Sequence, residues 1–505
     1  MSTKVITLKK AIKLRKVYKN RKIPVALLNG VFDILHYGHI LYFREAKKFA
    51  KKIILSITND QFVNKGPDRP YNQLHKRIEL LSSISEIDHI IINSNKNALN
   101  HIKSIKPDFY IKGKDYKNLD NDITKNIKFE KKTVNKFGGQ FIVTNSELFS
   151  SSNIINKEKQ RTNPILKKFL NKLDKEKLIK KINFNFKKKV KSKILVVGEP
   201  IIDNFINIKY LGKSSKSDII STTKIGENIK YGGIFLVAEA LSKHVEKIDL
   251  LLPKSNNLNY SKIIPKSINK IFLNLKDYKK IIKNRFINHY NQNLAFQLNE
   301  NDMNRFDRLD CKKISDKILY LNKKYNYDKI ILFDYGHGLL NQDVILRLNS
   351  LKKKLLVNCQ SNSSNYGFNT INKYFKSNTI CIDEDEFRLS VQDKVSSIEN
   401  LIKKNKNMTN KFKSFLITMG KYGCYIIKRS KKPIYIPTII ENLKNTIGAG
   451  DIFYCYYIIS ELTKKFDKIE SGLIAHLGAG IYLNDKEKKV VEKNDFIKFS
   501  QSLLK

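Results

Sequence analysis

The chain has 505 residues, of which 41% are hydrophobic and 10% aromatic, so it is long enough for two or three domains with apolar cores. It contains no run of 18 apolar residues, which predicts no membrane-spanning helix, and its N-terminus lacks a signal-peptide core, so the cytoplasm is the expected location. The formal net charge of +49 comes almost entirely from lysine. Because arginine, which suits bidentate contacts with phosphate and guanine, is scarce, we expect a solvated basic surface and predict no nucleic-acid partner.

Short strands and helices alternate from residue 23 to residue 152. The expected strands are apolar and rich in β-branched residues: Pro24–Leu28, Lys52–Ile57, His89–Asn93, Phe109–Lys112 and Gln140–Thr144. The expected helices lie between them: Gly38–Lys51, Leu74–Ser83, Asn97–Ile105 and Ile123–Lys136. Such alternation is typical of a doubly wound parallel sheet, which binds ligands at the carboxyl ends of its strands.

A connector rich in lysine and asparagine separates this region from a second alternating region. We expect a first domain at 1–156, a basic linker with one amphipathic helix at 157–190, and a second domain at 191–505. The strands expected in the second domain begin at Lys193 and continue with Ile248–Leu252, Lys329–Phe333, Lys354–Asn358, Thr379–Ile382, Ser414–Thr418 and Tyr425–Ile427. The predicted fold class is therefore α/β in both domains.

The sequence HYGH at residues 36–39 follows the first expected strand and opens the first expected helix. A helix N-terminus offers unpaired N–H donors and a partial positive charge, so it suits a phosphate group. His36 and His39 would add two imidazole donors for a triphosphate; the alternative is that both are ordinary turn residues. All five cysteines lie in the C-terminal half without CxxC spacing, so no zinc site is predicted.

Other cationic and hydroxyl side chains fit the same site. Lys65 lies in a loop bounded by glycine and proline, and Arg77 lies on the helix that follows. Ser150, Ser151 and Ser152 come after the last strand and would offer hydroxyl and backbone N–H groups. Transfer of a nucleotidyl group needs mainly alignment and charge neutralisation, which such groups supply. Lys65 is equally consistent with a solvated loop lysine.

These residues together resemble the cytidylyltransferase-like nucleotidyltransferase superfamily. Its signature, G-x-F-D-x-x-H-x-G-H, matches GVFDILHYGH at 30–39, and its serine motif matches SSSNII at 150–155. Within the superfamily, KGPDRPYNQLHKR and PDFYIKGKDY resemble segments of the adenylyltransferase domain of the bifunctional heptose kinase/adenylyltransferases. The resemblance implies a Rossmann-like fold that uses ATP and Mg²⁺.

The same resemblance implies roles for individual residues. His36 and His39 would hold the triphosphate, while Lys65 and Arg77 would contact phosphates. The remaining nucleotide-binding residues implied by the motifs are Gly30, Phe32, Asp33, Ser150, Ser151 and Ser152. Asp33 is as readily a turn or cap residue as a ligand.

A second constellation lies near the C-terminus, where Gly448, Ala449 and Gly450 precede Asp451 at the start of an expected helix. Backbone N–H groups in such a turn can stabilise the charge on a phosphoryl group in transfer. Asp451 could then accept the proton of the attacking hydroxyl. For this turn alone, a capped helix start is an equally good interpretation.

The context of the turn resembles the ribokinase-like sugar kinases, from about Lys193 to the C-terminus. NTIGAGD at 445–451 resembles their D-T-x-G-A-G-D signature, with Asn445 in the place of an aspartate. The resemblance implies that Asp203, Gly232 and Gly233 bind the sugar, and that Asp383, Glu386, Thr418 and Gly420 serve the nucleotide and Mg²⁺. The asparagine that usually follows the glycine pair is not evident.

The polar stretch Asn358–Tyr374 matches no segment of the heptose kinases and follows an expected strand. It either lines the cleft, which would indicate a different sugar, or forms an ordinary surface loop.

The sequence therefore predicts a bifunctional enzyme. A sugar kinase with Asp451 as base would make a sugar phosphate, and the N-terminal domain would join sugar 1-phosphate to AMP, giving an ADP-heptose-like product for surface polysaccharide synthesis. The resemblance implies ATP in both reactions and a homodimer, with the two domains in the opposite order to the heptose enzymes. The alternative is an active ATP- or CTP-dependent transferase with a degenerate kinase domain that binds sugar or dimerises.

Overall fold

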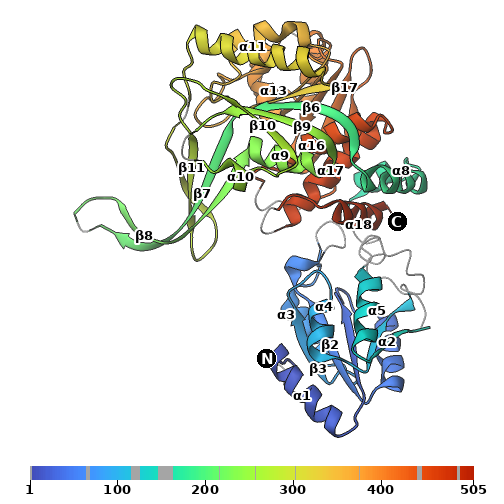
Figure 1. The fold of residues 1–505 in the computed structure, drawn as a ribbon. Coiled ribbons are helices and arrows are strands. Elements are labelled where there is room, and N and C mark those ends of the chain that lie inside the picture. Colours follow the sequence, from blue (N-terminus) through green and yellow to red (C-terminus); the bar gives the residue numbers. More distant parts are fainter. Residues whose placement is uncertain are drawn as a thin grey trace. The chain divides into compact units, whose positions relative to one another are not determined.

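The computed structural model describes residues 3–63, 69–114, 126–145, 163–214, 216–255, 258–301, 303–374, 376–440, 446–485 and 489–504. The chain divides into two compact units (Figure 1). Unit 1 comprises Met1–Ile182, Asn484–Lys488 and Asn494–Lys505, and unit 2 comprises Asn183–Leu483 and Lys489–Lys493. Within the described ranges, no helix has the length and apolar character needed to cross a bilayer.

Unit 1 is built on a parallel sheet with the strand order β3-β2-β1-β4-β5. Its strands are β1 (Val25–Gly30), β2 (Lys52–Thr58), β3 (His89–Asn93), β4 (Phe109–Lys112) and β5 (Gln140–Val143). Its helices are α1 (Leu8–Asn20), α2 (Tyr37–Phe49), α3 (Leu74–Ser82), α4 (Leu99–Ile105) and α5 (Asn126–Lys136). The order reverses at β1, which is where a doubly wound sheet binds its ligands.

Alternate residues of the central strands of unit 1 pack into two apolar cores, one on each face of the sheet. Ala26 and Leu28 pack with Phe43 of α2 on one face of the sheet, whereas Val25 and Leu27 pack with Ile102 of α4 on the other. Burial on both faces explains why these strands appear in the sequence as short, nearly continuous apolar runs. The prediction of a doubly wound α/β domain is confirmed.

Unit 2 contains a nine-stranded sheet with the order β10-β9-β6-β13-β14-β15-β16-β17-β18, in which β17 is antiparallel to both of its neighbours and the other pairs are parallel. Its strands are β6 (Val190–Gly198), β9 (Val245–Pro253), β10 (Ile268–Leu273), β13 (Lys329–Asp334), β14 (Leu355–Cys359), β15 (Thr379–Asp383), β16 (Ser414–Thr418), β17 (Cys424–Lys428) and β18 (Ile434–Ile436). The helices of this unit are α9 (Ile234–Ser242), α10 (Tyr260–Ile263), α11 (Arg308–Tyr325), α12 (Gln342–Arg347), α13 (Glu384–Val391), α14 (Ile398–Lys404), α15 (Lys406–Thr409), α16 (Ala449–Thr463) and α17 (Lys468–Asn484).

A second, four-stranded sheet of unit 2 was not predicted. It has the order β12-β11-β7-β8 and consists of β7 (Pro200–Lys213), β8 (Ile220–Gly233), β11 (Ile281–Asn288) and β12 (Leu294–Asn299). The long hairpin of β7 and β8 projects from the rest of its unit (Figure 1). Much of this sheet is exposed, so its sequence lacks the apolar runs by which buried strands are found.

The connector holds two helices, α7 (Pro164–Leu170) and α8 (Lys175–Lys187), where the sequence predicted one. Asn163 caps α7 by accepting a hydrogen bond from the N–H of Leu166, and Pro164 occupies the first helical position, where its missing N–H costs nothing. The last helix of the chain is α18 (Lys493–Leu504).

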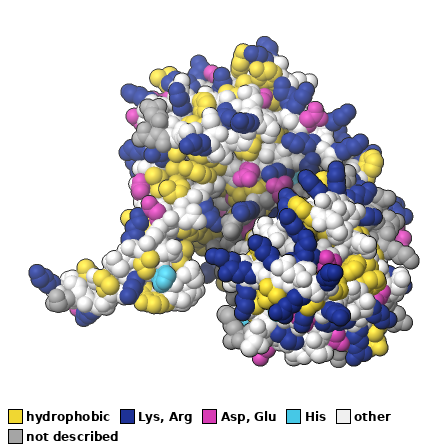
Figure 2. All heavy atoms as spheres, turned by 60° about the horizontal axis from the view of Figure 1, so that its bottom comes forward, with side chains coloured by type: hydrophobic (Ala, Val, Ile, Leu, Met, Phe, Trp, Pro, Cys, Tyr) yellow, Lys and Arg dark blue, Asp and Glu magenta, His cyan; other side chains and the backbone are white. Residues whose placement is uncertain are grey.

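Lysine and arginine side chains are dispersed over the visible face of the molecule, with acidic and apolar side chains among them (Figure 2). This distribution agrees with the expectation that the net charge of +49 is mostly solvated surface.

Candidate functional site

The HYGH turn of unit 1 lies where the sequence placed it, between β1 and α2. His36 is the N-cap residue of α2, with an extended backbone, and His39 lies in its first turn. The two imidazole rings are stacked with their centroids 3.9 Å apart, and the N–H of His36 donates to Nδ1 of His39 over 3.4 Å. The structure therefore brings both imidazoles together at a helix N-terminus, a position that favours anions.

Gly30 and Phe32 shape the backbone that leads into this turn. Phe32 adopts a left-handed conformation with φ of +51°, and its ring packs edge-on against His39 at 5.3 Å. A Cβ on Gly30 would lie 2.8 Å from the Phe32 ring, so the close turn requires glycine there. Both residues support the histidines from the carboxyl end of β1.

Asp33 lies in the segment between β1 and α2 and caps neither neighbouring helix, because the N-cap residues are His36 for α2 and Gln73 for α3. Its buried carboxylate accepts hydrogen bonds from the N–H groups of Tyr71 (3.0 Å) and Asn72 (2.9 Å) and pairs with Arg69 at 3.2 Å. The carboxylate is thus satisfied by protein donors and fixes the segment that precedes α3.

Arg77 departs from the phosphate contact expected of it. Its side chain is fully buried, and its guanidinium donates to the carbonyl oxygens of Val31 (2.5 Å), Thr58 (2.9 Å) and Asn72 (3.0 Å) and to the Asp60 carboxylate (2.7 Å). A guanidinium occupied by four protein acceptors ties the loops after β1 and β2 together. These contacts use four of its five N–H donors and the side chain is buried, so the geometry favours a positioning role over a phosphate contact.

Several predicted residues lie outside the described ranges and have no structural account: Lys65, Ser150, Ser151, Ser152 and Asn445.

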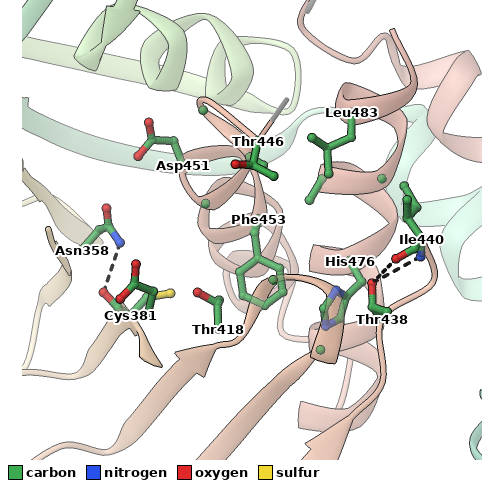
Figure 3. Close-up of a pocket in the computed structure, with 18 of the residues that line it drawn as sticks. Asn358, Cys381, Thr418, Thr438, Ile440, Thr446, Asp451, Phe453, His476 and Leu483 are labelled. Atoms are coloured by element: carbon green, nitrogen blue, oxygen red, sulfur yellow. Dashed lines mark hydrogen bonds between the residues drawn. The ribbon is translucent and has the colours of Figure 1, made fainter. Parts of the chain in front are cut away.

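In unit 2, the predicted nucleotide and base residues meet at one cavity of about 350 Å³ (Figure 3). The lining residues that the sequence had singled out are Gly448, Ala449, Gly450, Asp451, Asp383, Glu386, Thr418 and Gly420. Asp451 and Asn358 lie at one end of the cavity, and His476, Thr438 and Ile440 lie at the other (Figure 3). Residues from β14, β15, α13, β16, α16 and α17 thus converge where α16 begins and where β15 and β16 end.

The glycine turn before α16 positions Asp451. Gly448 is the N-cap residue of α16 with φ of +78°, and a Cβ there would lie 2.8 Å from the Tyr482 hydroxyl oxygen. The carboxylate of Asp451 accepts a hydrogen bond from the Gln360 side-chain amide at 2.6 Å. Burial raises the pKa of Asp451 to about 7, while Gln360 and the nearby Tyr335 hydroxyl act in the opposite direction. A carboxyl with this pKa is suited to accept a proton near neutral pH.

Asp383 and Glu386 form the start of α13 at the cavity wall. Asp383 accepts from the N–H of Glu386, and the Glu386 carboxylate accepts from the N–H groups of Asp383 and Ser361 at 2.7 and 2.8 Å. Burial and the neighbouring Asp383 raise the pKa of Glu386. Two neighbouring carboxylates offer the oxygen ligands that Mg²⁺ prefers, and the bound cation would reduce the repulsion between them.

The predicted sugar residues lie on the four-stranded sheet, outside the lining of this cavity. Asp203 of β7 pairs with the Arg285 guanidinium at 2.8 Å, and a Cβ on Gly232 would collide with the Asp203 carboxylate. Gly233 has φ of +56°, which favours glycine. The charges of Asp203 and Lys283 both influence Asp451, so this sheet contributes to the electrostatics of the base.

Sequence reasoning missed Gln360, Lys283 and Arg285. Lys283 and Arg285 lie on β11 and were hidden because that strand was not predicted. Gln360 lies within the polar stretch Asn358–Tyr374, whose position after a strand was the one available signal. Asn358, Gln360 and Ser361 line the cavity, which favours the cleft interpretation of this stretch over a surface loop.

Known families match each unit separately. Residues 27–158 match the cytidylyltransferase-like family, and residues 283–465 match the pfkB family of carbohydrate kinases. The chain joins a cytidylyltransferase-like domain to a pfkB-type kinase domain. The predicted order of the two domains is thereby confirmed.

Relatives and solved structures resemble parts of the chain. The protein called "Bifunctional protein HldE" from Blochmanniella floridana is 39% identical over 142 residues, which is 28% of this chain and 28% of that protein. The protein of the same name from Blochmanniella pennsylvanica is 32% identical over 157 residues, 31% of each chain. The matched segments thus span less than a third of these relatives. Phosphofructokinase-2 from Escherichia coli superimposes with a TM-score of 0.48 at 12% identity, covering 62% of this chain and 99% of that one.

Proposed function

We propose that the protein is a bifunctional sugar kinase and sugar 1-phosphate adenylyltransferase that makes a nucleotide-activated sugar of the ADP-heptose type. One observation carries the kinase half: Asp451, the glycine turn, the Asp383–Glu386 pair and Thr418 line a single cavity. Side chains able to act as base, metal ligands and anion hole are present together at this cavity, which supports an active kinase domain over a degenerate one.

In the proposed kinase reaction, the cavity binds ATP. The apolar residues at one end, which include Ile439, Ile440 and Phe453, suit the base, and His476 beside them is neutral because burial lowers its pKa to about 4. The N–H groups at the start of α16 would stabilise the transferred phosphoryl group. Asp451 would accept the proton of the sugar hydroxyl as its oxygen attacks the γ-phosphorus and ADP leaves.

In the proposed transferase reaction, the N-terminus of α2 and the paired imidazoles of His36 and His39 hold the triphosphate of ATP. The sugar 1-phosphate attacks the α-phosphorus and pyrophosphate leaves, so the site has to align two anions and neutralise their charge. Lys65 and the serines at 150–152 are proposed to complete this site.

Mg²⁺ is the proposed cofactor of both reactions, and the carboxylates of Asp383 and Glu386 fit it in the kinase site. When bound there, it would neutralise the phosphates of ATP. In the parts of the chain that are described, no group of three or more His, Cys, Asp or Glu side chains forms a site for another metal.

The proposed organisation keeps the expected boundaries at residues 156 and 190, a cytoplasmic location and a homodimer. Exposed apolar residues of the four-stranded sheet support dimerisation, because an exposed apolar sheet gains stability from a partner. They are Tyr210, Leu211, Ile220, Ile225, Ile229, Leu294, Phe296 and Leu298.

A two-step assay tests the proposal. The purified protein is supplied with ATP, Mg²⁺ and a panel of sugar phosphates that includes heptose 7-phosphate, and then separately with sugar 1-phosphates and ATP or CTP. We expect ADP release in the first assay and pyrophosphate release with ATP in the second. A product that requires CTP would overturn the adenylyl assignment, and the absence of phosphorylation across the panel would favour the degenerate kinase domain.

A further inference from the structure

The side chain of Gln360 links the base of the kinase site to the central sheet. Its amide nitrogen donates to Oδ1 of Asp451 and to Oδ1 of Asn358, each over 2.6 Å. Asn358 in turn donates to the carbonyl oxygen of Cys381 in β15 over 3.1 Å. A primary amide has two N–H donors, and both are used here, so the chain of hydrogen bonds fixes the rotamer of Gln360.

The backbone of Gln360 is held as firmly as its side chain. Its N–H donates to the carbonyl oxygen of Asp334 over 2.8 Å, and its carbonyl oxygen accepts from Nδ2 of Asn369 over 2.8 Å. Asp334 is itself buried and pairs with Lys373 at 2.6 Å. Gln360 is therefore anchored to a buried ion pair, and Asn369 and Lys373 belong to the same polar stretch.

The next residue contacts the other carboxylate of the site. The N–H of Ser361 donates to Oε1 of Glu386 over 2.8 Å. Two consecutive residues thus touch the base Asp451 and the proposed Mg²⁺ ligand Glu386. A movement of this segment would displace both carboxylates together.

Charged and polar groups from several elements face Asp451. Asp203 of β7 disfavours its ionised form, whereas Lys283 of β11, the Tyr335 hydroxyl after β13 and the Gln360 amide favour it. Glu386 of α13 and Cys455 of α16 also interact with Asp451. Gln360 is a neutral donor that lies 2.6 Å from Oδ1 of Asp451. Its hydrogen bond to the ionised carboxylate is strong because the site is buried.

We propose that Gln360 is a positioning residue of the kinase reaction, which holds the Asp451 carboxylate in the orientation that accepts the proton of the sugar hydroxyl and stabilises its ionised form. The proposal rests on the proposed kinase function. Gln360 does not itself exchange a proton. Its effect is exerted through Asp451.

Gln360→Met removes the donor at nearly constant size. We expect kcat to fall about tenfold or more, KM for ATP and for the sugar phosphate to stay within about threefold, and the acid limb of the pH–rate profile to move up by about one pH unit.

Gln360→Glu places a second carboxyl beside Asp451. The two carboxyls would share a proton, so the acid limb of the pH–rate profile should move further towards high pH. Gln342→Met, at an exposed glutamine of α12, is the matched control and should behave as wild type.

The pH profile separates positioning from a general structural effect. An acid limb that stays in place in both Gln360 variants, or a loss confined to KM, would overturn the proposal. An unmoved acid limb would leave Gln360 with a purely structural role, and a loss confined to KM would make it a substrate contact.

A second measurement does not depend on activity. A buried carboxyl with a raised pKa binds its proton more tightly in the folded state, so wild type loses stability relative to Asp451→Asn as pH rises, until the folded pKa is passed. When the same comparison is made between Gln360→Met and the double variant Gln360→Met/Asp451→Asn, the loss of stability should continue to a pH about one unit higher. An unchanged end-point would overturn the role of Gln360, whereas the lack of any phosphorylation by wild type would overturn only the kinase function.

Discussion

Two helix N-termini, one in each unit, are built by similar means and serve different chemistry. In unit 1, α2 begins after a turn that needs Gly30 and presents the stacked imidazoles of His36 and His39. In unit 2, α16 begins at Gly448 and encloses the buried carboxylate of Asp451. Both turns place the backbone N–H groups of a helix N-terminus where a phosphate site is proposed.

The side chain that accompanies the helix start makes the difference. Imidazoles add donors for an anion, so the role proposed for the HYGH turn is to bind and align phosphates. A carboxylate repels phosphate, and it is useful beside one only if it accepts a proton, for which its pKa must lie near the working pH. Burial raises the pKa of Asp451 to about 7. In unit 1, by contrast, the Asp33 carboxylate pairs with Arg69 and accepts hydrogen bonds from two backbone N–H groups. The following predictions test this contrast.

The largest effect is expected from Asp451→Ala. Loss of the base should lower ATP-dependent sugar phosphorylation by about 10²–10⁴-fold and leave adenylyl transfer to a supplied sugar 1-phosphate unchanged. Both rates are measured on the same preparation, with Asp343→Ala, an exposed aspartate of α12, as the control. A parallel loss of both activities would show that the two sites are not independent.

Replacing His36 and His39 with alanine should reverse this pattern. Each replacement removes a donor to the triphosphate and should lower pyrophosphate release by about 10²-fold, while phosphorylation stays unchanged. His289→Ala, at an exposed histidine of unit 2, serves as the control. Full transferase activity in the double variant would make the pair ordinary turn residues.

Arg77→Met should act on stability more than on ATP binding. It leaves the Asp60 carboxylate and three carbonyl oxygens without their donor, at a cost of about 3 kcal/mol or more. Arg77→Lys should not rescue it, because lysine lacks the planar fork of donors. Urea unfolding measures the loss; normal stability with weakened ATP binding would restore the phosphate contact predicted from the sequence.

The smallest effect concerns pH. With the pKa of Asp451 raised to about 7, the base is ionised above that pH and protonated below it, so phosphorylation should be about tenfold slower at pH 6 than at pH 8. No base is proposed for adenylyl transfer in unit 1, so its rate should not follow the ionisation of Asp451. A rate–pH profile of each reaction, recorded in the same buffers, tests the difference.

The sequence was sufficient for most strands of the two larger sheets, because these strands are buried on both faces and separated by helices, but β10 and β18 were not predicted. It was not sufficient for the four-stranded sheet, where β12 exposes Leu294, Phe296 and Leu298 and gives no sign of a core. The motif residues of the kinase converge as expected. Gln360 could not be assigned from spacing, because its partner Asp451 lies in another element far along the chain.

Arg77 illustrates a different limit. Arginine is scarce in the sequence, which suggested that Arg77 contacts a phosphate. The pattern of residues does not distinguish a guanidinium that binds a ligand from one that binds four protein acceptors. That distinction depends on the loops after β1 and β2, which only the folded structure brings together.

The strand order of unit 2 has a consequence for how the chain folds. Strand β6 pairs with β13, where Leu195 lies opposite Ile330, and β13 is synthesised long after β6. Closing so long a loop is slow, because its entropy is lost before the contacts form. In unit 1 the pairs β1–β2 and β2–β3 join strands that are close in the sequence. A ribosome-bound chain should therefore pair β1, β2 and β3 early, whereas β6 can pair with β9 but gains its second neighbour only after β13 has been synthesised.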